Sequence, residues 1–152
     1  MAGVRGIAAK ATDEDLAAAT AETVLQLVAA ANHRVLVVEW GISFDGTVNT
    51  NEPVTVELLL QTNAGTSSSL TVQKMNEGDN ETLQTTALQD FAAEPTGTTI
   101  VAPPVLVHPQ GGYTWQAGGF VLPIPIIGGS RLGMRCTAPD AVNCRPYMIF
   151  EE

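Results

Sequence analysis

Alternation of large apolar and polar residues is clearest between Arg34 and Phe44, where the chain reads RVLVVEWGISF. Every even-numbered position from 36 to 44 is large and apolar, and the odd-numbered positions turn polar or small after Val37. A period of two in a stretch rich in β-branched and aromatic residues is typical of a strand with one buried face. We therefore expect a strand here. Its core-facing residues would be Leu36, Val38, Trp40, Ile42 and Phe44.

Similar strands are predicted along most of the remaining chain. Asp45 and Gly46 form a turn signal directly after the first strand. Residues 54–62, VTVELLLQT, alternate again, with Val56, Leu58 and Leu60 on one face. Shorter apolar stretches follow up to the last residues, separated by turns rich in glycine, serine and proline. This pattern predicts an all-β fold, an antiparallel β-sandwich of the jelly-roll type with about eight strands.

Two stretches have a mixed pattern. Thr12 followed by three acidic residues resembles the start of a helix, whereas ETVLQLVAA also fits a strand. We expect a short N-terminal arm or helix over residues 1–20, a strand from about Thr23 to Ala29, and a single sandwich domain over residues 21–152. Residues 76–97 are mostly polar, and we expect an exposed excursion with one helical turn around residues 85–91.

The segment FVLPIPII, residues 120–127, combines strand-forming residues with two prolines. Pro123 and Pro125 are two positions apart, so their missing N–H groups would lie on the same side of one strand. That strand can pair only through its other side, which predicts an edge strand with apolar residues available for a subunit contact. The residues expected at this contact are Leu122, Pro123, Ile124, Pro125 and Ile126.

The charge of the chain restricts its possible partners. It has 16 acidic and 7 basic residues and a net charge of −9, so a nucleic-acid backbone is not an expected partner. Residues 1–12 nevertheless contain Arg5 and Lys10 and no acidic residue. This basic segment either docks on an acidic neighbour or is a flexible start of the chain. Only 15% of residues are charged, compared with about 25% in typical domains, which suggests a surface partly covered by another subunit.

Targeting and membrane signals are not apparent in the sequence. The first twelve residues lack the continuous apolar core of a secretory signal, and no apolar run approaches the roughly 20 residues that span a bilayer. We therefore expect synthesis in the cytoplasm and no membrane partner. The two cysteines, Cys136 and Cys144, would lie opposite each other if the last two strands form a hairpin about Asp140. Because a disulfide across directly paired strands is strained, we expect buried free thiols.

No stretch carries a recognised catalytic or ligand-binding motif. Neither His33 nor His108 lies beside a serine or cysteine nucleophile in a known arrangement, so we expect both to be structural or solvated. The contiguous acidic residues 13–15 diverge, and those between residues 77 and 81 lack the ligand order of a calcium loop. We expect no catalytic residue, no cofactor and no metal.

Several short blocks resemble segments of one group of proteins. These blocks are NHRVLVVEWGISFDGT, EPVTVELLLQT, TTALQDFAAEPT, VHPQGGY and RLGMRCTAPDAVNCRPYMIFEE. They are similar to small tailed-phage and prophage proteins that are encoded among virion structural genes, and they extend over most of the chain from Thr23 to Glu152. A small β-rich protein without enzyme motifs in such a gene neighbourhood is similar in kind to capsid decoration (cement) proteins. Those proteins bind the outside of the shell as oligomers, often trimers, and brace it.

The resemblance implies a non-enzymatic virion structural protein, with a capsid decoration protein as the first hypothesis. Its partners would be further copies of itself, with a trimer favoured, and the major capsid protein or another virion protein. It would be assembled in the cytoplasm of the bacterial host. The alternative is a tail or baseplate jelly-roll module that binds host-surface carbohydrate, with Tyr113 and Trp115 as a stacking platform, although such aromatic residues more often pack in a core or interface. A hydrolase built on a β-sandwich is a third hypothesis, and no motif favours it.

Overall fold

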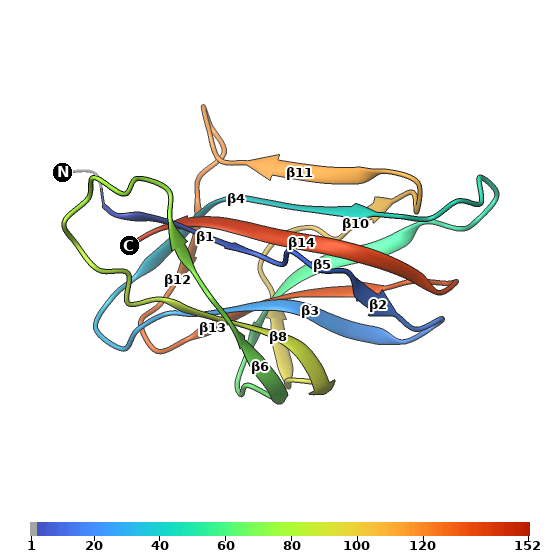
Figure 1. The fold of residues 1–152 in the computed structure, drawn as a ribbon, viewed down its shortest axis with the longest axis horizontal. Coiled ribbons are helices and arrows are strands. Elements are labelled where there is room, and N and C mark those ends of the chain that lie inside the picture. The colour runs from blue at the N-terminus through green and yellow to red at the C-terminus, as the bar shows by residue number, and fades with distance from the viewer. Residues whose placement is uncertain (1–2) are drawn as a thin grey trace.

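The computed structural model describes residues 3–152 and consists of two antiparallel sheets of seven strands each, packed face to face (Figure 1). The first sheet contains β1 (Arg5–Ala9), β2 (Glu14–Leu16), β4 (Val35–Phe44), β7 (Gln73–Lys74), β11 (Gly112–Gln116), β12 (Ile124–Ile126) and β14 (Val142–Glu151). The second sheet contains β3 (Ala21–Val28), β5 (Val54–Gln61), β6 (Thr66–Leu70), β8 (Thr86–Ala93), β9 (Gly97–Ile100), β10 (Val105–Val107) and β13 (Arg131–Thr137). The predicted all-β, antiparallel β-sandwich is confirmed.

Long strands lie at the centre of each sheet and short strands at its edges. In the first sheet β4 pairs with β14, and β11 and β12 lie one after the other along the remaining side of β4. β1 and β2 share the other side of β14 in the same way. In the second sheet the order is β10-β5-β13-β3-β8-β6, with β9 also on β5. Because the edges are divided into short pieces, the strands outnumber the predicted eight.

The core lies between the sheets, and the residues of β4 that face it are only partly those predicted. Its buried residues on this strand are Val35, Val37, Trp40, Ile42 and Phe44. The second half of the strand therefore faces the core as predicted. In the first half the prediction is wrong, because Leu36 and Val38 are only half-buried and Val35 and Val37 take their place.

A β-bulge explains this change of face. β14 pairs Ile149 with Glu39 and Phe150 with Val37, so Val38 has no partner on β14. One extra residue in a strand reverses the alternation on either side of it. The bulge lies where β11 ends and β12 begins, since Gln116 is opposite Glu39 and Ile124 is opposite Val37.

The N-terminal segment is part of the sandwich instead of an arm or helix. β1 pairs with β14 from Tyr147 to Glu151, and β2 pairs with it from Val142 to Cys144. Strand pairing overrides the helical signal of Thr12 and the acidic residues after it, because β14 offers an unpaired edge and Leu16 becomes buried. No helix in residues 3–152 is long and apolar enough to cross a membrane.

Two further predictions concern the middle and the end of the chain. The strand expected from Thr23 to Ala29 is confirmed as β3. The helical turn expected at residues 85–91 is wrong, because β8 pairs with β3 and β6 there; the β6 and β8 pair lies at the bottom of Figure 1. The last two strands do not form a hairpin, because β13 and β14 belong to different sheets. Cys136 and Cys144 are buried between the sheets as free thiols.

Candidate interaction surface

One lateral side of the sandwich carries no charged residue. Residues 95–130 contain no Asp, Glu, Lys or Arg, and they include all of β9, β10, β11 and β12. At the average composition of the chain, a segment of this length would hold about five charged residues. β9 and β10 flank β5, whereas β11 and β12 flank β4, so the segment covers the adjoining edges of both sheets. We call residues 95–130 the uncharged side.

Exposed apolar side chains concentrate on the uncharged side. In residues 3–152 eight large apolar side chains are exposed, and six of them belong to this side. The six are Ile100, Leu106, Phe120, Val121, Leu122 and Ile127. Phe120 is fully exposed, with 105% of its reference area accessible, and Leu122 is 80% exposed. A single exposed apolar residue needs no explanation, but a cluster of them marks an interaction site.

The loop between β11 and β12 displays three of these residues in a defined conformation. Gly118 and Val121 exchange two backbone hydrogen bonds of 2.9 Å, which close a tight turn around Phe120. Gly119 has a φ of 57°, in the left-handed region that glycine adopts without strain. The loop projects beyond β11 at the top of Figure 1. Phe120 is therefore held at the tip of an ordered turn.

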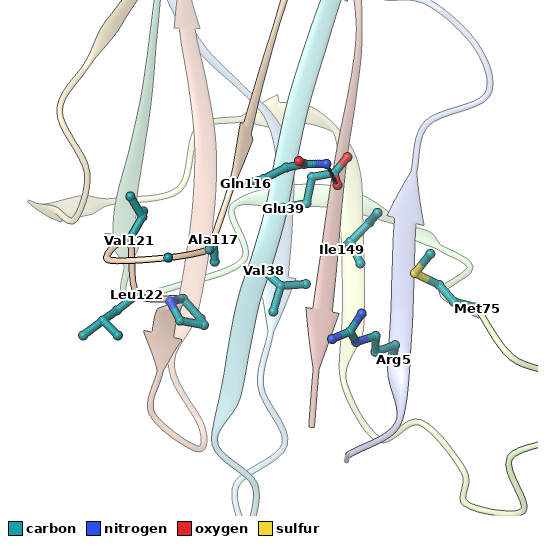
Figure 2. A pocket seen from close by; sticks show the side chains of 12 residues that line it. Arg5, Val38, Glu39, Met75, Gln116, Ala117, Val121, Leu122 and Ile149 are labelled. Atoms are coloured by element: carbon teal, nitrogen blue, oxygen red, sulfur yellow. Dashed lines mark hydrogen bonds between the residues drawn. The ribbon is translucent and has the colours of Figure 1, made fainter.

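A groove of about 550 Å³ lies at the base of this loop, on the outer face of the first sheet (Figure 2). Val38 and Glu39 both line it, because the bulge directs two successive side chains of β4 outward. Leu122 forms one wall, and Arg5 and Met75 lie on the opposite side. We call this depression the outer groove.

Glu39 organises the polar contacts of the outer groove. The Tyr147 hydroxyl donates to Glu39 Oε1 at 2.6 Å, and Gln116 Nε2 donates to Glu39 Oε2 at 2.6 Å. Burial of the Tyr147 ring, together with its hydrogen bond to the Glu39 carboxylate, raises the pKa of Tyr147. Arg5 pairs instead with Glu151, at 3.2 Å. The Glu39 carboxylate is thus bonded to Tyr147 and Gln116, and the groove combines these polar groups with apolar walls such as Val38 and Leu122.

The five residues predicted for an edge contact are divided between core and surface. β12 pairs only with β4 among the described strands, so the predicted edge strand is confirmed. Ile124 and Ile126, however, are buried in the core, because they lie opposite Val37 and Val35 on the inner face. Leu122 and Pro125 are exposed, and Pro123 lines the outer groove. The available part of the predicted contact is therefore Leu122, Pro123 and Pro125.

The two basic residues predicted to reach a neighbour are engaged within the chain. Arg5 forms its ion pair with Glu151. The side chain of Lys10 is 3% exposed and pairs with Glu14 and Asp90. Burial alone would lower the pKa of Lys10, but hydrogen bonds to both carboxylates outweigh it and raise this pKa. Lys10 thus links the first sheet to β8 of the second, and its burial keeps it from contacting another molecule.

Tyr113 and Trp115 face inward from β11. Both pack against the core cluster, and the ring centroid of Tyr113 lies 5.1 Å from that of Trp40. The alternate residues of the strand, Gly112 and Thr114 among them, are exposed. The two aromatic rings are half-buried side chains of the sandwich, which is the packing that sequence statistics favour for such residues.

The remaining candidate residues are dispersed. His33 Nε2 lies 3.1 Å from Gln84 Nε2, and His108 Nδ1 accepts a hydrogen bond from the Gln110 N–H at 3.1 Å within a turn. No group of three His, Cys, Asp or Glu side chains in residues 3–152 is arranged to hold a metal ion. Burial raises the pKa of Cys136 well above its ordinary value.

The distribution of charge is the sequence signal that locates this surface. Total charge and single motifs do not reveal it, whereas the absence of charge over residues 95–130 can be read from the sequence alone. The strand pairings then show that this one segment forms one side of the molecule. In comparisons with known proteins, no family model, no curated protein and no solved structure matches this chain.

Proposed function

We propose that this protein is a non-enzymatic structural protein that binds other protein subunits through its uncharged side, most simply as a capsid decoration protein of a tailed-phage virion. The observation that carries the proposal is the concentration of exposed apolar residues, the fully exposed Phe120 among them, on a side without charged residues. The short sequence blocks that resemble phage virion proteins supply the biological setting.

The energetics of such a contact favour an assembly of many subunits. Burying an exposed side chain such as Phe120 or Leu122 contributes roughly 1.5–3 kcal/mol. Association costs several kcal/mol of rotational and translational freedom, so only a few such residues give modest affinity at one site. In a shell, the same contact repeats many times and stabilises only the assembled state, by mass action. The uncharged side is suited to such a repeated contact between subunits.

The finer description of the fold belongs to the same proposal. Successive strands β3, β4 and β5 alternate between the two sheets, as do β13 and β14. Alternation of this kind is a property of double-sheet jelly rolls, and it supports a jelly-roll type of sandwich. The net charge of −9 supports protein partners over nucleic acid, because a phosphate backbone would be repelled.

The alternative, a tail or baseplate module that binds host-surface carbohydrate, rests on Tyr113 and Trp115. Its weakness is that both rings pack against the core cluster, so neither presents a free face as large as a sugar ring requires. The two proposals differ in the part of the virion with which the protein sediments, and this difference provides the test.

The experiment adds purified protein to heads and to tails from particles that lack it, and measures what sediments with each. We expect the protein to sediment with heads. A double variant, Phe120→Ser with Leu122→Ser, should reduce head occupancy at least about tenfold, because two apolar contacts are lost. Val48→Ser is the matched control, since Val48 is exposed but outside the uncharged side. Sedimentation with tails alone, or full occupancy by the double variant, would contradict the proposal.

A further inference from the structure

β11 is a sheet edge without the usual protection against pairing. Its five residues, GYTWQ, include no charged residue and no proline. Among the described strands it pairs only with β4, so its other side is open. Natural proteins normally block such edges with lysine, proline, bulges or very short strands. An open edge of this length can accept another strand.

The hydrogen bonds at the two ends of β11 show which of its residues face the open side. The Phe44 N–H donates to the Gly111 carbonyl at 2.9 Å, and the Ala117 N–H donates to the Val38 carbonyl at 2.8 Å. Residues 111, 113, 115 and 117 therefore direct their backbone groups toward β4, because the direction alternates along a strand. The backbone N–H and C=O groups of Gly112, Thr114 and Gln116 point to the open edge.

Three other edges of the described sandwich, at β12, β7 and β6, are less suited to a partner strand. β12 continues the same edge, but Pro123 and Pro125 remove two of its donors. β7 is only two residues long. β6 is an open edge of five residues, but Ser68 at its centre donates to the exposed Asp90 carboxylate. A second acidic molecule at β6 would therefore place like charges together.

We propose that β11 pairs antiparallel with β11 of a second copy of this chain, across a two-fold axis at Thr114. This inference rests on the proposed use of the uncharged side as an assembly surface, and it names the partner of that side. With Thr114 opposite Thr114 of the second copy, Gly112 lies opposite Gln116 of that copy. This register uses all five residues, and every backbone group on the open edge gains a partner.

The side chains are self-complementary in the same register. Tyr113 of one copy lies opposite Trp115 of the other, twice, on the inner face of the joined sheet. Aromatic pairs directly opposite each other are among the favourable cross-strand pairs. Because the strand carries no charge, no like charges oppose each other along it when two identical copies pair, although each chain has a net charge of −9. A second copy therefore suits this edge better than an arbitrary strand does.

The loop with Phe120 extends the same contact. It leaves β11 at the strand's C-terminal end, and it projects past the open edge (Figure 1). In an antiparallel pair this end adjoins the start of β11 of the second copy, next to its turn at residues 108–111. Phe120, fully exposed in one chain, would be covered in the pair. Its exposure is thereby explained together with the open edge.

The first test measures the mass of the protein in solution over a dilution series. We expect a species of twice the chain mass of 16.0 kDa that dissociates on dilution. Thr114→Pro removes an N–H on the open edge and leaves the bonds to β4 in place, so it should raise the dissociation constant at least about tenfold. Thr114→Val keeps that N–H and is the matched control. A monomeric or trimeric wild-type protein would overturn the two-fold pairing.

A second test does not depend on the behaviour of a proline variant. Thr114→Cys places two thiols opposite each other at the two-fold axis, with about 5.5 Å between their Cα atoms. A short bis-maleimide should then link two chains, whereas Ser68→Cys, on the open edge of β6, should remain unlinked. Cys136 and Cys144 are buried and do not compete. Equal linking of both variants would contradict the inference.

These outcomes are separable from those of the proposed function. A dimer that binds neither heads nor tails would refute the proposed function and leave the pairing of β11 intact. A Thr114→Pro protein that is monomeric but still occupies heads fully would show that the shell is bound without this pairing, and it would exclude the second copy as the partner required for assembly. A trimer that occupies heads would support the proposed function and refute the two-fold axis.

Discussion

The two lateral sides of the sandwich end their sheets in opposite ways. On the side of β1, β2 and β8, charged groups join the sheets: Lys10 contacts both Glu14 and Asp90, and the Glu152 carboxylate accepts the Thr85 N–H at 2.9 Å. On the uncharged side no ion pair is possible, because residues 95–130 contain no charged residue. There the edges consist of short strands, prolines and exposed apolar residues.

The difference between the two sides is whether their polar groups are paired within the chain. On the side of β1, β2 and β8, which we call the charged side, the charged groups pair within one chain. The buried Lys10 ammonium there donates to both Glu14 and Asp90. On the uncharged side, the outward backbone N–H and C=O groups of β11 have no intramolecular partner in the described residues. The apolar side chain of Phe120 is also left exposed there. We infer that the first side maintains the fold and that the second is available for assembly.

The largest expected effect comes from breaking the charged side. Lys10→Met removes the only cation that contacts Glu14 and Asp90 in the described residues, and it leaves the mostly buried Glu14 carboxylate unpaired. We expect the free energy of unfolding to fall by about 2–3 kcal/mol. Urea denaturation measures this change. Arg145→Met is the matched control, because the Arg145 side chain is 58% exposed in its pair with Asp13 and should lose less than about 1 kcal/mol. Equal losses in the two variants would contradict the comparison.

An intermediate effect is expected when the prolines that block the edge at β12 are replaced. The double variant Pro123→Thr with Pro125→Thr restores backbone donors to β12 and should increase self-association, which light scattering detects. Stability should change by less than about 1 kcal/mol, because both positions lie on an edge strand. Pro103→Thr with Pro104→Thr is the control, since these exposed prolines lie between strands β9 and β10. If the β12 variant associates no more than this control, the prolines do not protect the edge.

The smallest effect is a dependence of the Lys10 contribution on pH. Hydrogen bonds from Lys10 and Ser68 lower the pKa of Asp90, whereas burial raises the pKa of Glu14 despite its pairing with Lys10. A carboxylate with a lowered pKa stabilises the folded state above its ordinary range, and this contribution is lost as the pH falls through the lowered value. The stability difference between wild type and Lys10→Met should therefore narrow below about pH 4. Denaturation midpoints near neutral pH and in acid provide the measurement, and a constant difference would exclude the ion pairs as its source.

Local sequence patterns predict where β4 and β5 begin, but they do not predict bulges or the pairing partners of strands. β4 and β5 begin within one residue of their predicted positions, because alternation over eight to ten residues is a local property. The bulge at Val38 depends on the register with β14, which lies far along the chain, and no local pattern contains that information. For the same reason, Thr12 and the acidic residues after it predict an arm or helix, although β14 supplies the edge on which β1 and β2 form.

A buried polar cluster on the second sheet was also invisible in the sequence. Gln26 Nε2 donates to Gln61 Oε1 at 2.6 Å, and Gln61 Nε2 donates to Thr23 Oγ1 at 2.9 Å. All three residues are buried, although glutamine is usually exposed. Their hydrogen bonds to one another make this burial tolerable, and such mutual satisfaction depends on strand pairing.

The proposed interaction surface was predictable in part. The spacing of Pro123 and Pro125 identified an edge strand correctly, because the missing N–H groups are a property of the residues themselves. The direction of Ile124 and Ile126 into the core, and the open edge of β11, follow from pairing with β4. Sequence patterns alone therefore identify the edge strand but do not show which of its residues a partner can reach.

The placement of β13 and β14 has a consequence for synthesis on the ribosome. β13 lies between β3 and β5, and β14 lies between β4 and the β1 and β2 pair, so each sheet receives a central strand only after residue 130 has been made. Until then, the apolar faces of β3, β4 and β5 leave the ribosome without their main partner strands. Nonlocal pairing of this kind is slow and exposes the nascent chain to aggregation. The protein therefore depends on late closure of its sheets, and chaperones that shield emerging strands should raise its yield.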